Sequence, residues 1–552
     1  MTAKHKPNII IFDPDQMRAD ALHHLGNEAA YTPNMDALAA EGVSFSNAFC
    51  QNPVCVPSRC SFMTGLYPHV HGHRTMNYLL HSGEDNLFLD LKKQGYYTMS
   101  TTRGDLLAGD DQAYHAQCID KYIRLQPTKD RVIKHTAFDR GDPDSDTFYS
   151  FYHGIIPTEE ADAISVNMDD LTVDGVIREI RSRPLDRPFF SFVGLVNPHP
   201  PYAIEQKYYD RINKSKLAPR KPTICDEDHK ASMETGLRDS LRIFSWSEER
   251  LNEIRTVYLA MCAKIDDQLG RLINALKEEG IYDDTVILVF SDHGDYTTDY
   301  GIVEKAQNCF PDCLVNIPLI IKPQKGIAME MGVNDNLAEL TDVCATCADL
   351  AGFSLDREQF GKSLLPMLRD KSVELHSCVF AEGGRLECET QAMEYDSKTF
   401  HAASEYAPRE LLQRKIPEHT KATMIRTRKY KYVRRLYEDD EFYDLSIGES
   451  QNLIHAPAYA ATILLLKEQM LTWYQSSCDI VPQKIDARFD EEFLFNNMRS
   501  KGATEQQIFT LKKRMEQAGK TAADIVSEML EKAGASQTPK EVFTCQDGKR
   551  NK

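Results

Sequence analysis

Long hydrophobic runs are missing from this chain of 552 residues. No window holds the roughly 18–20 consecutive apolar residues that a membrane-spanning helix needs, and the mean hydropathy is −0.45. The N-terminal segment MTAKHKPNIIIFDPD contains one short apolar run, Ile9 to Phe12, which is shorter than the hydrophobic region of a signal peptide. The sequence therefore predicts no membrane contact and a cytoplasmic location.

Positive charge is also in deficit, because 65 Lys and Arg residues face 83 Asp and Glu residues and the net charge is −18. Proteins that bind nucleic acid or anionic membranes depend on clustered Lys and Arg. Neither nucleic acid nor a membrane is therefore expected as the main partner, although local pockets for small anions are compatible with this composition.

Cysteine is sparse, with 14 residues in 552, and a chain without an export signal is expected to keep its thiols reduced. Cys344 and Cys347 form a CxxC pair, but no second CxxC and no His pair lies near them to complete a zinc site. The surrounding TDVCATCADLAG predicts an apolar helix with Gly352 just past its end. Cys309 and Cys313 are likewise expected to be structural.

Short apolar runs alternate with amphipathic helices over most of the chain. The runs are rich in Val, Ile and Phe, which predicts strands buried on both faces; they are 8–12, 188–196, 285–290 and 315–321. Helices are expected at 33–42 and 251–279. This alternation predicts an α/β fold with a mostly parallel central sheet flanked by helices. Ligands of such sheets bind beyond the carboxyl ends of the strands, where the following residues fall: Asp13, Asp15, His199, Asp292 and His293.

The pattern changes after residue 365. Residues 426–437 alternate basic with aromatic or apolar side chains, which predicts a half-exposed strand, and a shorter strand follows. We expect a large α/β domain at 1–365, a smaller α+β domain at 366–480 and a helical tail at 481–552 with helices at 504–518 and 521–533. Tails of this kind pack against neighbours, so a homo-oligomer formed through the tail is a hypothesis.

The most informative segment is 53–72, PVCVPSRCSFMTGLYPHVHG. Cys55 stands in a proline-flanked turn at the expected start of a helix, four residues before Arg59. A thiol at a helix N-terminus beside an arginine has a lowered pKa and is an ordinary nucleophile. A buried cysteine in a turn is the alternative, and the spacing alone does not decide between them.

The run Cys55-Val56-Pro57-Ser58-Arg59, continuing to Gly65, resembles the signature of the sulfatase family of the alkaline phosphatase superfamily. In that family a formylglycine-generating enzyme converts the cysteine of C-x-P-S-R to formylglycine. The hydrated aldehyde attacks sulfur, and the hemiacetal ester then expels sulfate. The resemblance implies an alkaline-phosphatase-like fold, formylglycine at position 55, Arg59 in the catalytic site and a small-molecule sulfate ester as substrate. Later segments extend it over residues 7–475.

Two further segments resemble the metal motifs of the family. They are 290–295, FSDHGD, and 7–20, PNIIIFDPDQMRAD, in which Asp13 is an additional acid. The resemblance implies one divalent metal ion, and its implied ligands are Asp15, Gln16, Cys55, Asp292 and His293. Carboxylates suit Ca²⁺, Mg²⁺ or Mn²⁺, and the imidazole favours Mn²⁺.

Two cationic groups resemble residues that the family places around the transferred group. They are Lys305 in VEKAQNCF and His199 in NPHPPY. Either would bind the oxyanion, and His199 would protonate the leaving oxygen. The chain departs from the family after 95–98, where the usual lysine becomes Arg103 and the usual histidine becomes Asp105. Arg103 still clamps an anion, whereas ionised Asp105 donates no hydrogen bond to sulfate, which argues against a common arylsulfatase.

The same metal pattern also resembles phosphonate monoester hydrolases and choline-sulfatase-like enzymes. In the former, an asparagine after a His-Arg pair contacts the substrate, and here Asn77 would supply it. His69, His71 and His73 either support this site or form a plain surface loop. The leading hypothesis is a sulfuric ester hydrolase, and the alternative is a phosphonate monoester or phosphodiester hydrolase on the same site. The intact motifs argue against a non-catalytic binder. Segment 114–156 lies where substrate loops of the family vary.

Overall fold

The structure is a computed structural model that describes residues 6–101, 104–124, 140, 142, 145–156, 168–394, 407–480 and 491–518. The chain divides into two compact units, Met1–Ile480 and Val481–Lys552. The predicted division at residue 365 stays a prediction.

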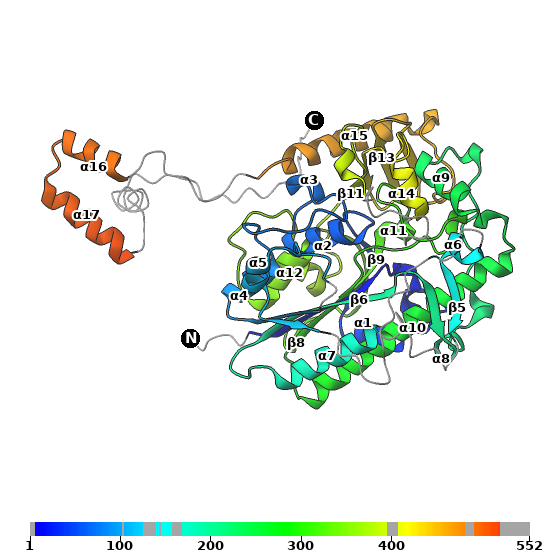
Figure 1. Cartoon of the computed structure of the whole chain (residues 1–552), viewed down its shortest axis with the longest axis horizontal. Coiled ribbons are helices and arrows are strands. Elements are labelled where there is room, and N and C mark those ends of the chain that lie inside the picture. Colours follow the sequence, from blue (N-terminus) through cyan, green and yellow to red (C-terminus); the bar gives the residue numbers. More distant parts are fainter. Residues whose placement is uncertain are drawn as a thin grey trace. The chain divides into compact units, whose positions relative to one another are not determined.

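An eight-stranded sheet forms the centre of the first unit (Figure 1), with the strand order β10-β2-β9-β8-β1-β6-β3-β4. The strands are β1 (Asn8–Asp15), β2 (Val43–Phe49), β3 (Tyr97–Thr101), β4 (Lys121–Ile123), β6 (Phe189–Pro198), β8 (Thr285–Phe290), β9 (Asn316–Lys322) and β10 (Gly332–Glu339). Among these described strands β9 alone runs antiparallel to its neighbours, β8 and β2. The predicted mostly parallel α/β sheet is confirmed.

Strand β1 lies in the middle of this sheet and is apolar along its first half. It pairs in parallel with β6 on one side and β8 on the other, so that Ile11 lies opposite Phe192 and Leu288. All the residues from Ile9 to Phe12 are fully buried. Because both faces of the strand are covered, its sequence is a continuous apolar run rather than an alternating one.

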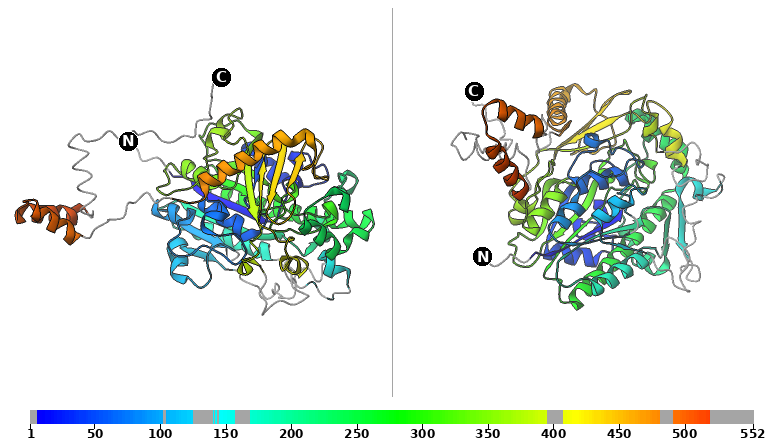
Figure 2. Two further views of the ribbon diagram at one scale, coloured as in Figure 1. Left: turned by 90° about the horizontal axis from the view of Figure 1, so that it is seen from above. Right: turned by 60° about the vertical axis from the view of Figure 1, so that its left-hand side comes forward.

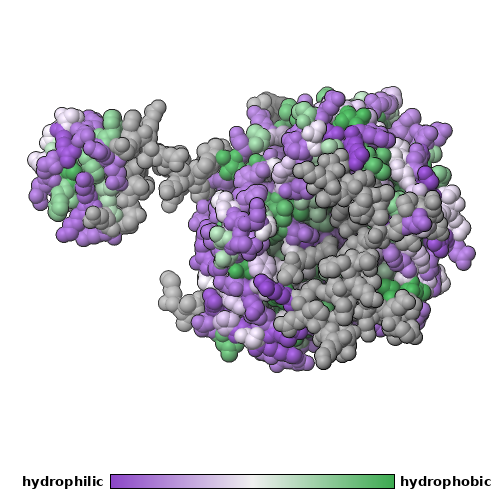
Figure 3. Space-filling model, in the orientation of Figure 1, coloured by the Kyte–Doolittle hydropathy of each residue, from purple (hydrophilic) through white to green (hydrophobic). Residues whose placement is uncertain are grey.

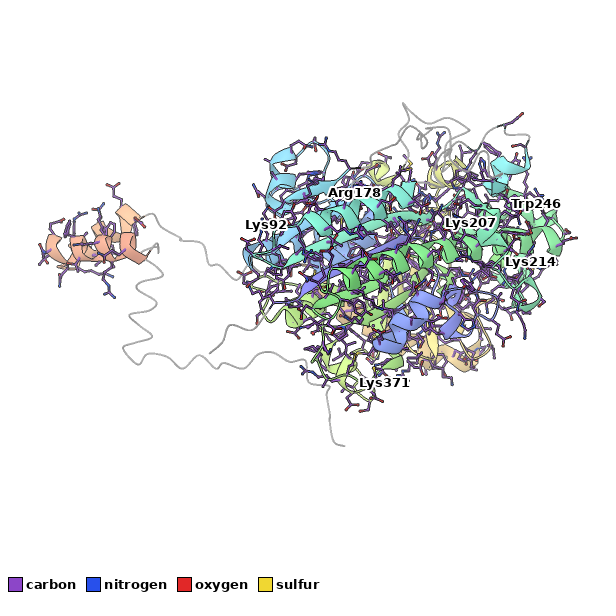
Figure 4. The ribbon with its side chains drawn as sticks, turned by 90° about the horizontal axis from the view of Figure 1, so that it is seen from below. Lys92, Arg178, Lys207, Lys214, Trp246 and Lys371 are labelled. Atoms are coloured by element: carbon purple, nitrogen blue, oxygen red, sulfur yellow. The ribbon has the colours of Figure 1, made fainter. Side chains whose placement is uncertain are left out.

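Helices cover both faces of the sheet (Figures 1 and 2). One layer contains α1 (Pro33–Glu41), α7 (Met168–Ser182) and α10 (Glu248–Glu278), and the other contains α2 (Cys55–Thr64), α4 (Leu87–Lys93) and α12 (Asp342–Ala351). In Figure 4, α7 and α10 lie side by side, with Arg178 of α7 on the outer surface. The predicted helices at 33–42 and 251–279 are thus confirmed, the second beginning at Glu248 because Ser247 accepts a hydrogen bond from the Arg250 amide at 3.2 Å.

The predicted CxxC helix is confirmed as α12, in which Cys344 and Cys347 are both buried. Gly352 ends it with a φ of 79°, a left-handed conformation that glycine adopts without strain. Cys309 is buried as well, and Cys313 is partly buried. These thiols serve as small apolar side chains in the packing.

A smaller antiparallel sheet follows in the same unit, with the order β11 (Val379–Gly383), β12 (Ala422–Arg426), β13 (Tyr430–Arg435) and β14 (Glu441–Asp444). Helix α15 (Ala460–Ser477) packs on it, and the Trp473 indole stacks on Phe380 with ring centroids 4.4 Å apart. The strand predicted at 426–437 is present as β13, with shorter bounds, and the shorter strand predicted after it is β14. The expected half-exposure is wrong, because Lys431 is fully buried and acidic side chains from other elements pair with it.

The described part of the second unit is a pair of helices, α16 (Glu491–Ser500) and α17 (Glu505–Ala518), that pack through Phe495, Ile508 and Met515. Helix α17 agrees with the helix predicted at 504–518, and the one predicted at 521–533 lies outside the described residues. The described surface of the first unit in Figure 3 is mainly hydrophilic. None of the described helices combines the length and the apolar character needed to cross a membrane.

Candidate active site

The predicted metal ligands meet at one edge of the central sheet. Strand β1 ends at Asp15, and β8, its neighbour, is followed directly by Asp292 and His293. Helix α2 begins at Cys55 and directs its N-terminus to the same place. These four buried residues each offer one ligand atom, and the four atoms all lie within 4.8 Å of one another.

The arrangement around His293 fits a bound cation. Its Nδ1 donates a hydrogen bond to the Gly294 carbonyl at 2.9 Å, so Nε2 carries the lone pair of the neutral ring. This Nε2 lies 3.3 Å from the Cys55 Sγ, 3.6 Å from an Asp15 oxygen and 3.7 Å from an Asp292 oxygen. Burial lowers the pKa of His293 to about 4. A lone pair and two carboxylates therefore converge without a proton between them, which is the donor set of a divalent metal site.

Arg59 is a fully buried side chain that joins the carboxylates of the cluster. Its Nε donates to Asp292 and its Nη2 to Asp15, both at 2.9 Å, and Asp13 lies 3.6 Å from Nε. Among the described residues, neither carboxylate oxygen of Asp13 has a hydrogen-bond partner. Arg59 therefore positions the acids. It also reaches outward, because its Nη1 lies 3.7 Å from an oxygen of Asp105, whose side chain is 39% exposed.

The unmodified Cys55 thiol is not a low-pKa nucleophile. Burial and the nearby Asp15 carboxylate raise the pKa of Cys55 well above its ordinary value, although Lys305 opposes them. Of the two alternatives that the spacing left open, the buried cysteine agrees with the structure, because complete burial and the acidic neighbours outweigh the helix N-terminus and Arg59.

Gln16 connects the cluster to two further buried groups. Its amide oxygen accepts a hydrogen bond from the Lys305 ammonium group, and its Nε2 donates to Asp295 at 2.5 Å. Its backbone has a φ of 72°, and its amide N–H donates to Asp292 at 3.1 Å. Lys305 thus lies beside the cluster, as predicted. The role of Gln16 as a metal ligand stays a prediction.

The sequence pattern assigned no role to Asp295, which organises this side of the site. It accepts hydrogen bonds from the Tyr202 hydroxyl at 2.9 Å and from the Thr297 hydroxyl at 2.8 Å, in addition to the Gln16 amide. The sequence did contain one indication of a role for Asp295, which is that it directly follows the Ser-Asp-His-Gly run. Tyr258 lies on the long helix α10, and its hydroxyl donates a hydrogen bond to the Gln16 carbonyl at 2.8 Å. Because α10 is far from Gln16 in the sequence, this contact could not be identified from the sequence.

The remaining predicted residues differ in their placement. His199 directly follows β6 and is buried, with Nδ1 2.7 Å from the Pro200 carbonyl. Asn77 is exposed, and within the described chain its amide donates to the Met393 carbonyl at 3.2 Å rather than to the cluster. Arg103 lies outside the described residues.

The three loop histidines hold acidic residues outside the metal cluster. The His69 Nδ1 lies 2.7 Å from Glu382, and both His71 and His73 contact Glu84. The plain-loop alternative is therefore wrong for His69 and His73, which are largely buried, whereas His71 is exposed.

Comparison with known proteins agrees with this geometry. The family model described as Sulfatase matches residues 7–353. An arylsulfatase of Clostridium perfringens is 26% identical over 399 residues, which cover 66% of this chain and 79% of that protein. A choline-sulfatase of Rhizobium meliloti is 26% identical over 514 residues, covering 88% and 90%.

Among solved structures, the phosphonate monoester hydrolase of Agrobacterium radiobacter has the same fold, with a TM-score of 0.66, 22% sequence identity and coverage of 87% of this chain and 97% of that one. The family match extends over more than half of the chain and contains the whole four-residue cluster. The predicted resemblance is confirmed: the chain belongs to the sulfatase family, and it is a sulfuric ester hydrolase.

Proposed function

We propose that this enzyme hydrolyses a small-molecule sulfate ester with a formylglycine made from Cys55 and one divalent metal ion. One observation carries the proposal. The Cys55 side chain begins helix α2 inside the ligand cluster, 3.4 Å from Asp15 and 3.3 Å from His293. A nucleophile at this point is next to the metal that would activate it. The modification would require a formylglycine-generating enzyme as a partner, and we place both in the cytoplasm.

The metal and the modified residue each supply a defined chemistry. A bound Ca²⁺, Mg²⁺ or Mn²⁺ ion would act as a Lewis acid, and the formylglycine hydrate would supply the attacking oxygen. Asp15, Asp292 and His293 would hold the ion, with Gln16 as a further oxygen donor. Arg59 holds the two carboxylates in place through its 2.9 Å hydrogen bonds.

Three cationic groups would act on the substrate. Lys305, which is buried beside Gln16, and Arg103 would bind the sulfuryl oxygens as negative charge develops on them. His199 would donate its Nε2 proton to the departing ester oxygen from the doubly protonated ring, whose Nδ1–H is held by the Pro200 carbonyl. Asp105 and Asn77 would contact the rest of the substrate. An ionised carboxylate at 105 favours a hydroxyl or a cation there, and a choline-sulfatase is among the relatives.

A phosphonate monoester or phosphodiester remains the second candidate substrate. Phosphoryl and sulfuryl transfer both need an in-line nucleophile and a stabilised leaving oxygen. The pairing of Asp292 with His293 in the cluster is compatible with this alternative, because this metal pattern resembles phosphonate monoester hydrolases as well as choline-sulfatase-like enzymes.

Two measurements test the proposal. Peptide mass spectrometry should find residue 55 about 18 Da lighter than cysteine, as conversion of a thiol to an aldehyde requires. The purified enzyme should then be assayed on 4-nitrophenyl sulfate, carbohydrate sulfates, choline sulfate and a phosphonate monoester. Cys55→Ala should abolish turnover, whereas Cys60→Ala, a matched change at a second buried cysteine of α2, should retain it. An unmodified Cys55 in fully active enzyme would disprove the formylglycine mechanism, and preference for the phosphonate would select the alternative.

A further inference from the structure

A second group of metal-binding side chains lies outside the active site. His71, His73 and Glu84 each offer one ligand atom, and the three atoms lie within 4.8 Å of one another. One Glu84 oxygen is 3.0 Å from the His71 Nδ1 and 3.0 Å from the His73 Nε2. The side chains of His71, Glu84 and His73 are 38%, 19% and 8% exposed, so the group is accessible from solvent yet rests on a buried base.

The backbone brings these side chains together. His71 ends helix α3 (Pro68–His71), and Gly72 follows with a φ of 81°, which turns the chain so that His73 faces the same carboxylate. A residue with a Cβ is strained at that φ, so glycine is needed there. The other oxygen of Glu84 accepts a hydrogen bond from the His81 amide at 2.7 Å. The carboxylate is thus held before any ligand binds.

The geometry between His73 and Glu84 suits a bound cation. The His73 Nδ1 lies 2.9 Å from the Tyr78 carbonyl, which only accepts, so this nitrogen carries the proton. In the neutral ring Nε2 is then a lone pair that faces a carboxylate oxygen at 3.0 Å. Two lone pairs at that distance repel each other. A cation placed between these two atoms would bind both of them.

We propose that His71, His73 and Glu84 form a second metal site, which binds Zn²⁺ and is completed by water. Two imidazole nitrogens, one carboxylate oxygen and a solvent molecule are a common tetrahedral zinc set. Zinc bonds of about 2.0–2.2 Å place tetrahedral ligand atoms roughly 3.4 Å apart, so the two 3.0 Å separations between the imidazole nitrogens and the Glu84 oxygen need to open only slightly. The Tyr78 carbonyl would fix the tautomer and orientation of His73, as outer hydrogen bonds do in zinc proteins.

Zinc bound at this site would restrict the motion of the loop between α3 and α4. This loop spans residues 72–86 and includes Asn77. Zinc would then act as a structural cross-link between the end of α3 and the turn before α4. It would stabilise the folded chain because the unfolded chain does not hold the three ligands together.

The test is metal content of the full-length protein after chelation, reloading with zinc chloride and removal of free ion. Asp292→Ala/His293→Ala, which removes two ligands of the catalytic cluster, should retain about one zinc ion per chain by elemental analysis, and the same protein with His73→Gln added should retain none. Adding His455→Gln in place of His73→Gln, at an exposed histidine far along the chain, should change nothing. Zinc should also raise the melting temperature of Asp292→Ala/His293→Ala but not of the variant that also carries His73→Gln.

A second measurement guards against misfolded variants. The metal-free wild-type protein should be titrated with zinc in competition with a chromophoric chelator. Two binding steps are expected, and Glu84→Gln should weaken one of them at least tenfold. A single step in the wild type, or equal zinc content with and without His73→Gln, would show that the group is held by a proton alone and would overturn the proposal.

Discussion

At the scale of single residues, the charge balance of the site explains how it would attract a sulfate ester. Asp15 and Asp292 carry two negative charges into a fully buried cluster, and Arg59 and Lys305 are the buried cations nearby. Arg59 and Lys305 offset these two carboxylates, and Asp13 and Asp295 are further buried acids of the same site. A bound divalent cation would add positive charge that attracts the substrate anion and stabilises the negative charge that develops in the transition state.

Metal removal should therefore abolish activity and lower stability together. Chelation should inactivate the enzyme reversibly, and Asp292→Ala should reduce kcat by orders of magnitude, because the ion positions and activates the nucleophile. The melting temperature should fall on chelation, since an ion that binds only the folded state stabilises it. Asp283→Ala is the control, because this exposed aspartate pairs with Lys325 before β8. Full activity in protein shown to be metal-free would contradict the assignment.

The role of His199 can be separated from anion binding by the choice of leaving group. Loss of a general acid costs roughly 10²–10⁴-fold, and less when the leaving group needs no proton. His199→Ala should therefore slow an alkyl or sugar sulfate strongly and 4-nitrophenyl sulfate only mildly. Arg103→Ala should slow both, and Asp105→Ala should change substrate preference more than rate. Equal losses on both esters in His199→Ala would assign it to anion binding instead.

Local sequence identified the residues of the metal cluster but not their environment. The ligands follow strands whose apolar runs are easy to recognise, and β8 has the predicted bounds. The sequence left the state of the Cys55 thiol open, because its burial and the acids that raise its pKa, Asp15 and Asp292, come from distant parts of the chain. Glu84 was not identified at all, because nothing in its neighbourhood shows that Gly72 turns two histidines toward it.

At the scale of elements, a carboxylate of one helix organises the start of another. Asp266 lies on α10 and accepts hydrogen bonds from the amides of Asn34 at 3.1 Å and Met35 at 2.7 Å, in the first turn of α1. Burial raises the pKa of Asp266 to about 6 despite these bonds. Asp266 thus joins α1 and α10, two helices of the same layer, but its ionised form is destabilised by burial.

This shift predicts a pH dependence of stability. Because the folded pKa lies above the unfolded value, the folded state binds the proton more tightly, and the contribution of Asp266 to stability falls as pH rises through about 4 to 6. Between pH 5 and pH 8 the wild type should lose about 1 kcal/mol through this group. Asp266→Asn cannot ionise, so its urea midpoint should improve relative to wild type at the higher pH. A constant difference at both values would refute the assigned shift.

At the scale of the whole first unit, a buried lysine ties the small sheet to the central one. Lys431 of β13 is fully buried, and its ammonium group contacts Asp312 at 2.7 Å, the Phe310 carbonyl at 2.7 Å and Glu449. Asp312 begins the short helix α11 (Asp312–Val315), which leads directly into β9. The basic pattern of this segment suggested a half-exposed strand, because the acidic partners that bury Lys431 are remote in sequence.

Removal of this lysine should destabilise the whole unit. Lys431→Met leaves Glu449 without its buried ammonium partner, and losing one member of a buried pair costs about 3–5 kcal/mol. Asp312 still pairs with Arg426 at 2.8 Å, so the loss should lie near the lower end of that range. Arg434→Met is the matched control on the same strand, because Arg434 is 51% exposed, and exposed pairs contribute about 1 kcal/mol or less. Thermal melting should separate the two variants clearly. Similar melting temperatures would show that Lys431 is not a structural link.

The complete burial of Cys55 also sets an order of events in the life of the chain. A side chain with no solvent exposure at the base of a folded cluster is beyond the reach of another enzyme. The other residues of the cluster come from positions 15 and 292–293, so the cluster closes only when distant parts of the sheet have joined. If Cys55 becomes formylglycine, the conversion must precede that closure. The fraction of active molecules then depends on the rate of modification relative to the rate of folding. A chain that folds first stays inactive until it unfolds again.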